Sequence, residues 1–276
     1  MPISKVQSTR ASAMPAPGFP GATPALEVFG FKFKSGGPHI SRTMMLAELG
    51  AVLAAVPIAS DAQAYRSAVL QQNVLGKTTD STRRKSLRHL RELYALDEAI
   101  PLFGLLRRLQ AIDRGASLPL LALQVAWLRD PLLRATTQPV LDASVGDTVE
   151  RASLVQAFEA VFPNRYSEAT LKTTTQNAAS SWTQAGHLSG HVKKTRQQVR
   201  PTAVSVTMAL FLGQVAGYHG AAVFANPWVR LLDLGADRAR GMAQEAHRSG
   251  LLNLRAVGEV VELGFPLLNE AQRLAA

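Results

Sequence analysis

Apolar residues recur every three or four positions along most of the chain, which is the spacing of helices that place one face on a core. The pattern predicts helices over 41–56, 62–72, 80–96, 101–113, 119–128, 167–186 and 236–248, separated by glycine and proline. Two segments, 187–200 and 252–265, are typical of short β-hairpins. We therefore expect a mainly α fold, a helical bundle with helix-turn-helix or winged-helix-like units and short β-hairpins.

Shifts in composition divide the chain into four segments. Residues 1–38 are rich in alanine, proline, serine and glycine and are expected to form a flexible arm, with a short strand near 28–34. Residues 39–135 predict an N-terminal helical domain. Residues 136–200 begin with a turn-rich stretch and predict a helix-turn-helix or winged-helix-like unit. Residues 201–276 predict a C-terminal helical unit with a β-hairpin.

The helix expected at 167–186 has two different faces. Ser167 is a suitable N-cap, and Gly186 is a suitable C-terminal stop. The residues expected to face the core recur at spacings of four and three, at Leu171, Thr175, Ala178, Trp182 and Ala185. The other face offers hydrogen-bonding groups without negative charge, at Lys172, Thr173, Gln176, Asn177 and Ser180. Such a face suits the phosphates and base edges of nucleic acid.

The segments on either side complete a recognisable order of elements. Asp147 and Glu150 predict a capping box at the start of a first helix, which Pro163 ends. The hairpin expected after Gly186 carries four basic residues, Lys193, Lys194, Arg196 and Arg200. The order helix, turn, helix and hairpin is that of a winged helix. An ordinary helical hairpin with a solvated loop is the alternative.

The charge of the chain is positive and uneven. There are 30 Lys and Arg against 20 Asp and Glu, a net charge of +10, which indicates polyanionic partners. No acid lies between Glu168 and Asp233, and the helix expected at 80–96 carries an arginine stripe. The stripe and a nearby lysine are candidate contacts to a phosphate backbone: Lys77, Arg84, Arg88 and Arg91. A solvated helix face is the alternative.

The chain lacks the residues and motifs of common enzymes. It contains no cysteine, which excludes disulfides and thiolate chemistry. His187 and His191 lie beside glycines, so they are not expected to share a helical face as metal ligands do. No glycine-rich phosphate loop, nucleophile elbow or zinc-protease motif occurs. We therefore expect a protein with no catalytic residues, metal, cofactor or small-molecule substrate.

The most apolar segment, 201–229, holds no charged residue. Glycine, serine and threonine interrupt it, so we expect a buried core helix rather than a membrane span. Residues 1–38 lack the continuous apolar stretch of a signal peptide. Together with the absence of cysteine, these features predict a cytoplasmic protein.

Two runs of residues carry a family resemblance. The first comprises Ser35, residues 42–46 and Glu48, followed by residues 73–77 and 81–84, and the second comprises residues 165–171 and 185–188. These runs resemble the two halves of the BrxA family, a small component of BREX bacteriophage-defence systems. The resemblance implies a helical DNA-binding protein that acts with other BREX components and has no known catalytic residues. The N-terminal arm and the region after Arg200 depart from the shorter members of that family.

The sequence features thus predict a non-catalytic protein that binds double-stranded DNA, and the resemblance to BrxA implies that it is an accessory protein of an anti-phage system. One alternative is a helical scaffold or adaptor whose basic faces meet an acidic protein partner. Another is an RNA-binding protein. The chain has 10 Phe, 4 Tyr and 3 Trp, and Trp182 is expected on an inner face, so platforms for stacking single-stranded bases are not evident and duplex DNA is favoured.

Overall fold

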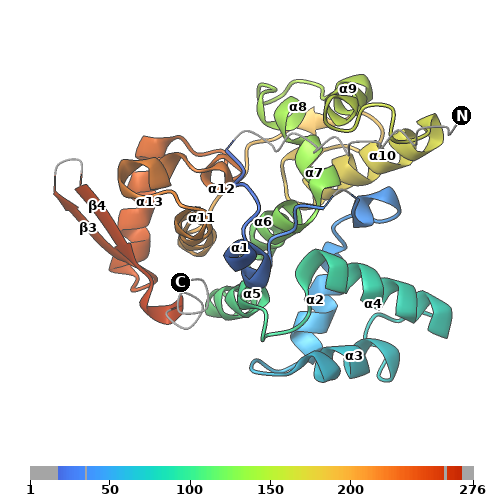
Figure 1. The fold of residues 1–276 in the computed structure, drawn as a ribbon, viewed down its shortest axis with the longest axis horizontal. Coiled ribbons are helices and arrows are strands. Elements are labelled where there is room, and N and C mark those ends of the chain that lie inside the picture. The colour runs from blue at the N-terminus through green and yellow to red at the C-terminus, as the bar shows by residue number, and fades with distance from the viewer. Residues whose placement is uncertain (1–17, 35, 258–259, 269–276) are drawn as a thin grey trace, which may run out of the picture.

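The computed structural model describes residues 18–34, 36–257 and 260–268. In these residues the protein is mainly helical, with two antiparallel β-hairpins, as Figure 1 shows. The α-helices are α1 (Pro24–Phe29), α2 (Leu46–Ala55), α3 (Ala62–Leu70), α4 (Asp80–Tyr94), α5 (Pro101–Ile112), α6 (Leu118–Arg129), α7 (Pro131–Ala135), α8 (Thr137–Leu141), α9 (Arg151–Val161), α10 (Glu168–Gln184), α11 (Ala203–Val215), α12 (Pro227–Arg230) and α13 (Ala236–Arg248). The strands are β1 (Leu188–Ser189), β2 (Thr195–Arg196), β3 (Asn253–Val257) and β4 (Val260–Gly264), and the 3-10 turns are η1 (Pro38–Ile40), η2 (Gly220–Ala225) and η3 (Pro266–Leu268).

Local side-chain chemistry sets many of the helix boundaries. Thr79 Oγ1 accepts from the backbone amide of Thr82 at 3.2 Å and starts α4. Ser167 Oγ accepts from the amide of Thr170 at 3.3 Å and starts α10, as predicted. Gly186, with φ of +88°, follows the end of α10. The sequence therefore places these helices correctly because their caps are local.

The capping box predicted at Asp147 is wrong. Helix α9 begins at Arg151, and Glu150, in the N-cap position, makes no side-chain hydrogen bond there. The backbone carbonyl of Asp147 instead accepts from the amide of Arg196 in β2 at 2.8 Å. The turn-rich stretch expected after residue 135 also contains a short helix, α8.

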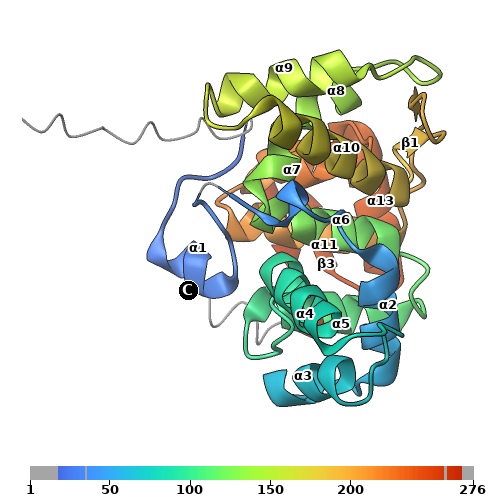
Figure 2. The same ribbon diagram turned by 90° about the vertical axis from the view of Figure 1, so that its right-hand side faces the viewer.

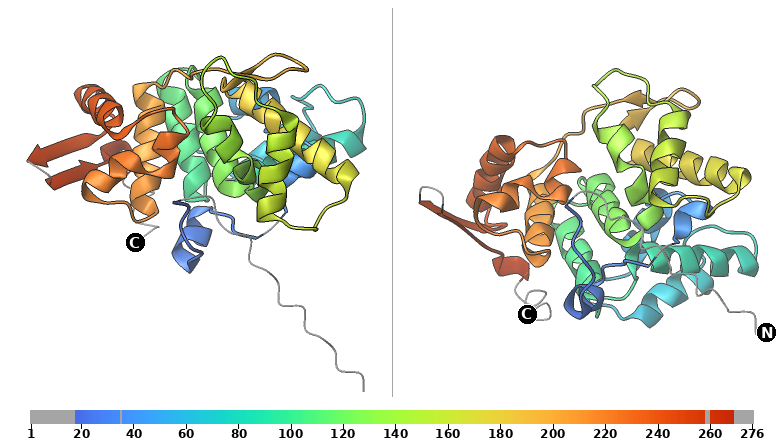
Figure 3. Two further views of the ribbon diagram at one scale, coloured as in Figure 1. Left: turned by 90° about the horizontal axis from the view of Figure 1, so that it is seen from above. Right: turned by 45° about the horizontal axis from the view of Figure 1, so that its top comes forward.

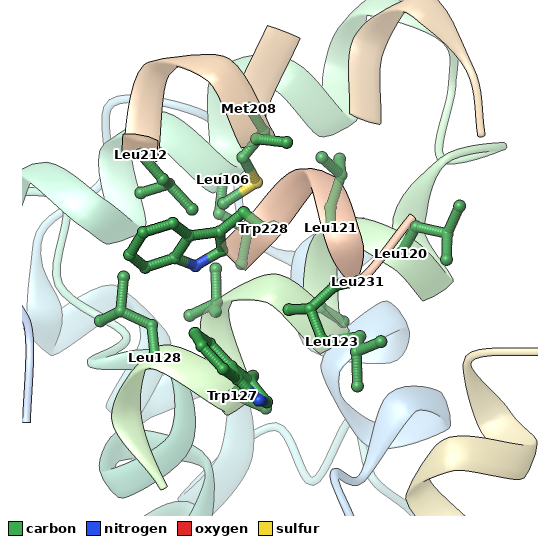
Figure 4. Packing of buried hydrophobic residues seen from close by; sticks show 14 of the residues in the cluster. Leu106, Leu120, Leu121, Leu123, Trp127, Leu128, Met208, Leu212, Trp228 and Leu231 are labelled. Atoms are coloured by element: carbon green, nitrogen blue, oxygen red, sulfur yellow. The ribbon is translucent and has the colours of Figure 1, made fainter. Parts of the chain in front are cut away.

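Helices α6 and α11 are buried on almost every side and form the centre of the molecule. Trp127 of α6 and Trp228 of α12 meet edge to face, with ring centroids 5.6 Å apart, among the leucines drawn in Figure 4. Helix α11 lies within the apolar segment 201–229 and is the buried core helix that the sequence predicts. Among the described residues, no helix has the length and apolar character needed to span a membrane.

The flexible arm predicted at 1–38 is wrong for the described residues 18–34 and 36–38, which pack on the rest of the protein. Residues 1–17 of the predicted arm lie outside the described residues. Phe19, Phe29 and Phe31 are buried in the core. Residues 24–29 form helix α1, which Thr23 caps, so the short strand predicted near 28–34 is also wrong. Phe19 packs against Trp127, Phe31 against Trp228 and Phe29 against Phe211, which explains why an alanine- and proline-rich segment is held in place.

The core runs across the predicted segment boundaries. One cluster of buried residues has members from Phe19 to Leu268, and a smaller one joins α7, α9 and α10 through residues such as Leu132 and Phe158. In Figure 2, α9 and α10 lie at one end of the molecule and α3 and α4 at the other. Figure 3 shows the β3–β4 hairpin projecting from the body beside α13. The segments 39–135, 136–200 and 201–276 therefore contribute to one shared core.

Candidate nucleic-acid interface

A small antiparallel sheet adjoins helices α9 and α10. Strand β2 pairs with β1, and on its other edge it pairs with the segment before α9 through Thr195 and Thr148. The amide of Val149 donates to the carbonyl of Lys194 at 2.8 Å in the same pairing. The order strand, helix, turn, helix and hairpin agrees with the winged-helix outline, in which α10 is the second helix of the helix-turn-helix and β1–β2 is the wing.

The inner face of α10 follows the predicted spacing. All five residues expected to face the core are buried, namely Leu171, Thr175, Ala178, Trp182 and Ala185. The indole Nε1 of Trp182 donates to Thr136 Oγ1 at 2.9 Å. Leu171 belongs to the smaller cluster with Phe158 and Phe162 of the preceding helix and turn. This packing fixes the angle between α9 and α10 and turns the opposite face of α10 outward.

Three predicted contact residues lie exposed on the first half of α10: Lys172, Thr173 and Gln176. The spacing of three and four residues from Gln176 places them on one stripe of the helix. Thr173 Oγ1 donates to the carbonyl of Ala169 at 3.0 Å, which leaves its lone pairs free to accept. Within the described part of the chain, the side chains of Lys172 and Gln176 have no hydrogen-bond partner. They can therefore meet a ligand without breaking an internal contact.

Asn177 and Ser180 are less accessible than the three residues on the first half of α10. Asn177 is half-buried, and its Nδ2 donates to the backbone carbonyl of His39 in η1 at 2.9 Å. Ser180 is half-buried one turn further along. Because η1 packs on this part of α10, the Nδ2 group of Asn177 is occupied by an internal contact.

Arg196 is not a surface residue, which corrects its predicted contact with phosphate. The residue is 3% exposed, and its guanidinium forms an ion pair with Asp233, which follows α12. A second nitrogen donates to the carbonyls of Gln197 and His187. Asp233 is the first acid after the acid-free stretch, so its position in the sequence gave no sign of this pairing.

Of the other predicted hairpin residues, one makes internal hydrogen bonds and two are exposed. The Nζ of Lys194 donates to Thr183 Oγ1 at 3.1 Å and to the carbonyl of Gly190 at 2.7 Å, so it closes the hairpin onto α10. Partial burial lowers the pKa of Lys194. Lys193 and Arg200 are exposed. Two of the four basic residues thus remain free to meet a polyanion.

His187 anchors the start of the hairpin from inside the core. Its Nε2 donates to the carbonyl of Leu231 at 2.8 Å, and its ring lies edge to face against Trp182, with centroids 5.0 Å apart. Burial lowers the pKa of His187 to about 4. The imidazole is therefore neutral at physiological pH, and Nδ1 has no partner in the described residues.

Sequence reasoning missed a buried chain of three polar side chains under α10. His39 Nδ1 lies 2.6 Å from Asp130 Oδ2, and His39 Nε2 lies 2.8 Å from Ser181 Oγ. None of the three side chains is exposed, and Ser181 also accepts from the amide of Met44 at 2.8 Å. Serine, histidine and aspartate are the residue types of a catalytic triad. Here the three side chains are buried, and their hydrogen bonds link η1, α7 and α10. The Asp-Pro pair at the start of α7 is the one local signal, because Asp130 also caps that helix.

The predicted arginine stripe on α4 forms a separate basic surface. Arg84, Arg88 and Arg91 are all exposed. Arg84 Nε pairs with Asp80 at 2.6 Å, and Arg88 Nε lies 4.0 Å from Glu92. Lys77 is instead occupied by Glu48, with 3.1 Å between Nζ and Oε1. Element η1 contacts both α4 and α10 and so joins the two helices that carry these surfaces.

No group of histidine and acidic side chains among the described residues suits a metal ion. No protein-family model and no curated protein matches the chain, so the resemblance to BrxA depends on the runs of residues quoted above.

Proposed function

We propose that this protein is a non-catalytic, DNA-binding accessory protein of an anti-phage (BREX) system, and that the first half of α10 contacts duplex DNA. The observation that supports this most directly is the exposed, acid-poor stripe of Lys172, Thr173 and Gln176 on α10, which would be the second helix of a helix-turn-helix. In helix-turn-helix proteins the start of this helix enters the major groove.

The chemistry of the stripe suits that role. The amide of Gln176 can donate and accept at the same time, which matches the N6 and N7 groups of adenine. Lys172 can donate to a phosphate or to guanine, and the Thr173 hydroxyl can accept from a base edge. A helix 10–12 Å wide fits the major groove of about 12 Å.

Exposed cations on either side of α10 add sequence-independent affinity. Arg165 lies in the turn before the helix, and Lys193 and Arg200 lie in the hairpin and the segment after it. Each contact with a phosphate releases condensed counterions, so affinity is expected to fall steeply with salt. The acid on this part of α10 is Glu168, at its first turn, where a carboxylate is favoured by the helix dipole.

The assignment to BREX draws its support from the resemblance of the quoted runs to BrxA. It implies other BREX components as partners and a cytoplasmic location, where the DNA of an invading phage is met. The structure offers no separate observation that favours the adaptor or RNA-binding alternatives.

The test is fluorescence anisotropy with a labelled duplex at several salt concentrations. Lys172→Gln is expected to weaken binding to all sequences and to flatten the slope of log affinity against log salt by about 0.9. Gln176→Ala is expected to reduce the preference among duplexes, by roughly 1–3 kcal/mol at the base that it contacts.

Arg248→Gln is the matched control. Arg248 is exposed on α13, on the side of the molecule away from α10 in Figure 1, and its loss changes the net charge equally. If Lys172→Gln and Arg248→Gln bind duplex with the same affinity and salt slope, α10 is not the contact. A protein that binds no duplex at low salt but binds an acidic protein would support the adaptor alternative instead.

A further inference from the structure

A pocket of about 400 Å³ opens between α3, α4 and the extended segment that follows α1. Five cationic side chains line it: Lys32, Arg66, Arg84, Arg88 and Arg91. Its volume lies in the range of small-molecule sites, about 300–1,000 Å³. In Figure 2, helices α3 and α4 lie at the end of the molecule opposite α9 and α10.

The pocket keeps a surplus of positive charge after its ion pairs are taken into account. The carboxylate of Glu92, which also lines the pocket, lies 4.0 Å from Arg88 and 3.7 Å from His89. Asp80 pairs with Arg84. Within the described residues Arg66 and Arg91 have no ion-pair partner. Several guanidinium groups are therefore available to one anion, in the planar geometry that binds phosphate with two hydrogen bonds.

Lys32 is held in the pocket in an unfavourable environment for its charge. Its Nζ donates to the backbone carbonyl of Glu92 at 3.0 Å. Burial, and then the neighbouring Arg129 guanidinium, lower the pKa of Lys32 to about 8, while Glu92 and Asp130 act in the opposite direction. A bound anion would relieve this repulsion between cations.

The pocket is not lined by charge alone. Leu70 of α3 and Leu87 of α4 contribute apolar surface between the arginines. A ligand that combines several negative charges with a less polar part uses both kinds of surface, whereas a simple inorganic anion uses only the first.

We propose that this pocket binds a free, phosphorylated small molecule of nucleotide size, with its phosphate groups held by Arg66, Arg88 and Arg91. The proposal does not depend on DNA binding by α10. The same phosphate chemistry is present in duplex DNA, so the experiment compares the two sources directly.

The experiment is isothermal titration of the full chain with pyrophosphate, AMP, ADP and ATP, without added metal. Affinity is expected to rise with the number of phosphates and to be higher for ADP than for pyrophosphate. Arg66→Gln or Arg91→Gln is expected to weaken ATP binding by about tenfold or more, the loss of one charged hydrogen-bonding group. Between pH 7.5 and 9 the affinity of the wild type is expected to fall as Lys32 loses its proton, and Lys32→Gln is expected to reduce that dependence.

Lys85→Gln is the matched control, since Lys85 is exposed on α4 but does not line the pocket. It is expected to bind ATP like the wild type, as is Lys172→Gln on α10, and thermal unfolding checks that each variant is folded. Equal losses in Lys85→Gln and Arg91→Gln would overturn the proposal, because they would indicate attraction by net charge only. Binding of duplex DNA through Arg66 and Arg91 with no binding of the four small anions would also overturn it, and would make α4 part of the DNA interface.

Discussion

The guanidinium of Arg196 in β2 forms a buried ion pair with Asp233 in the turn between α12 and α13. The second carboxylate oxygen of Asp233 accepts from the amide of Val199 at 3.1 Å. One carboxylate thus holds both the end of the hairpin and the chain that leaves it. The proposed DNA-binding unit is thereby fixed to the C-terminal third of the protein.

Arg196→Ala is expected to lower the free energy of unfolding by about 3–5 kcal/mol, because it leaves Asp233 buried without its partner. Lys193→Ala, three residues away and exposed, is expected to change stability by less than about 0.5 kcal/mol. Urea denaturation of both variants measures the difference. Equal stability of the two would show that the ion pair does not hold the hairpin.

His187 is expected to make the protein sensitive to acid. Its pKa is about 4 in the folded protein and near its ordinary value when unfolded, so the unfolded state binds the extra proton between pH 6.5 and 4. The stabilisation present at pH 7 is therefore lost as the pH falls through this range, by an amount on the order of 3 kcal/mol. His187→Gln, which keeps a donor for the Leu231 carbonyl, is expected to give a flatter dependence of unfolding free energy on pH. Parallel curves for the two proteins would contradict the prediction.

Asn177 and Gln176 are neighbours with different expected roles. Asn177→Ala removes the hydrogen bond to the His39 carbonyl and is expected to lower stability by about 1 kcal/mol without changing base preference. Gln176→Ala is expected to leave stability unchanged and to change base preference. Melting curves and anisotropy on a panel of duplexes measure the two properties separately. A changed base preference in Asn177→Ala would restore its predicted role as a base contact.

Trp182 tests whether the inner face of α10 acts only through folding. Trp182→Ala is expected to destabilise the protein by about 3–5 kcal/mol, since it removes a fully buried indole and its bond to Thr136. Duplex binding per folded molecule is expected to stay at the wild-type level at low temperature. A loss of affinity in protein shown to be folded by circular dichroism would place Trp182 closer to the interface than its burial indicates.

The sequence is informative where structure depends on neighbours along the chain. Ser167, Gly186 and the spacing from Leu171 to Ala185 predict α10 and its buried face because caps and helical periodicity are local. The same reasoning predicts α13 with its observed limits. Lys172, Thr173 and Gln176 are identified as exposed by the same periodicity.

The errors arise from partners that are distant in sequence. The predicted surface position of Arg196 is wrong because its ion-pair partner, Asp233, lies 37 residues away in the sequence. His39 and Asp130 are 91 residues apart, so no local pattern indicates their contact. The burial of Phe19 and Phe31 in the expected arm is missed for the same reason, since their aromatic partners lie in α6 and α12. Such contacts are set by tertiary packing, which periodicity does not encode.

The packing of Phe19 against residues far along the chain affects how the protein folds during synthesis. The centroid of its ring lies 5.3 Å from that of Trp127 and 6.2 Å from that of Trp228. The Arg134 guanidinium lies 3.8 Å from the centroid of the Phe19 ring. A ribosome delivers Phe19 early and Trp228 more than 200 residues later, at about 5–20 residues per second. At that rate, the segment around Phe19 exists for on the order of ten seconds or more before all the residues that it packs against have been synthesised. The nascent protein therefore exposes an aromatic segment that chaperones can hold until translation has passed α12.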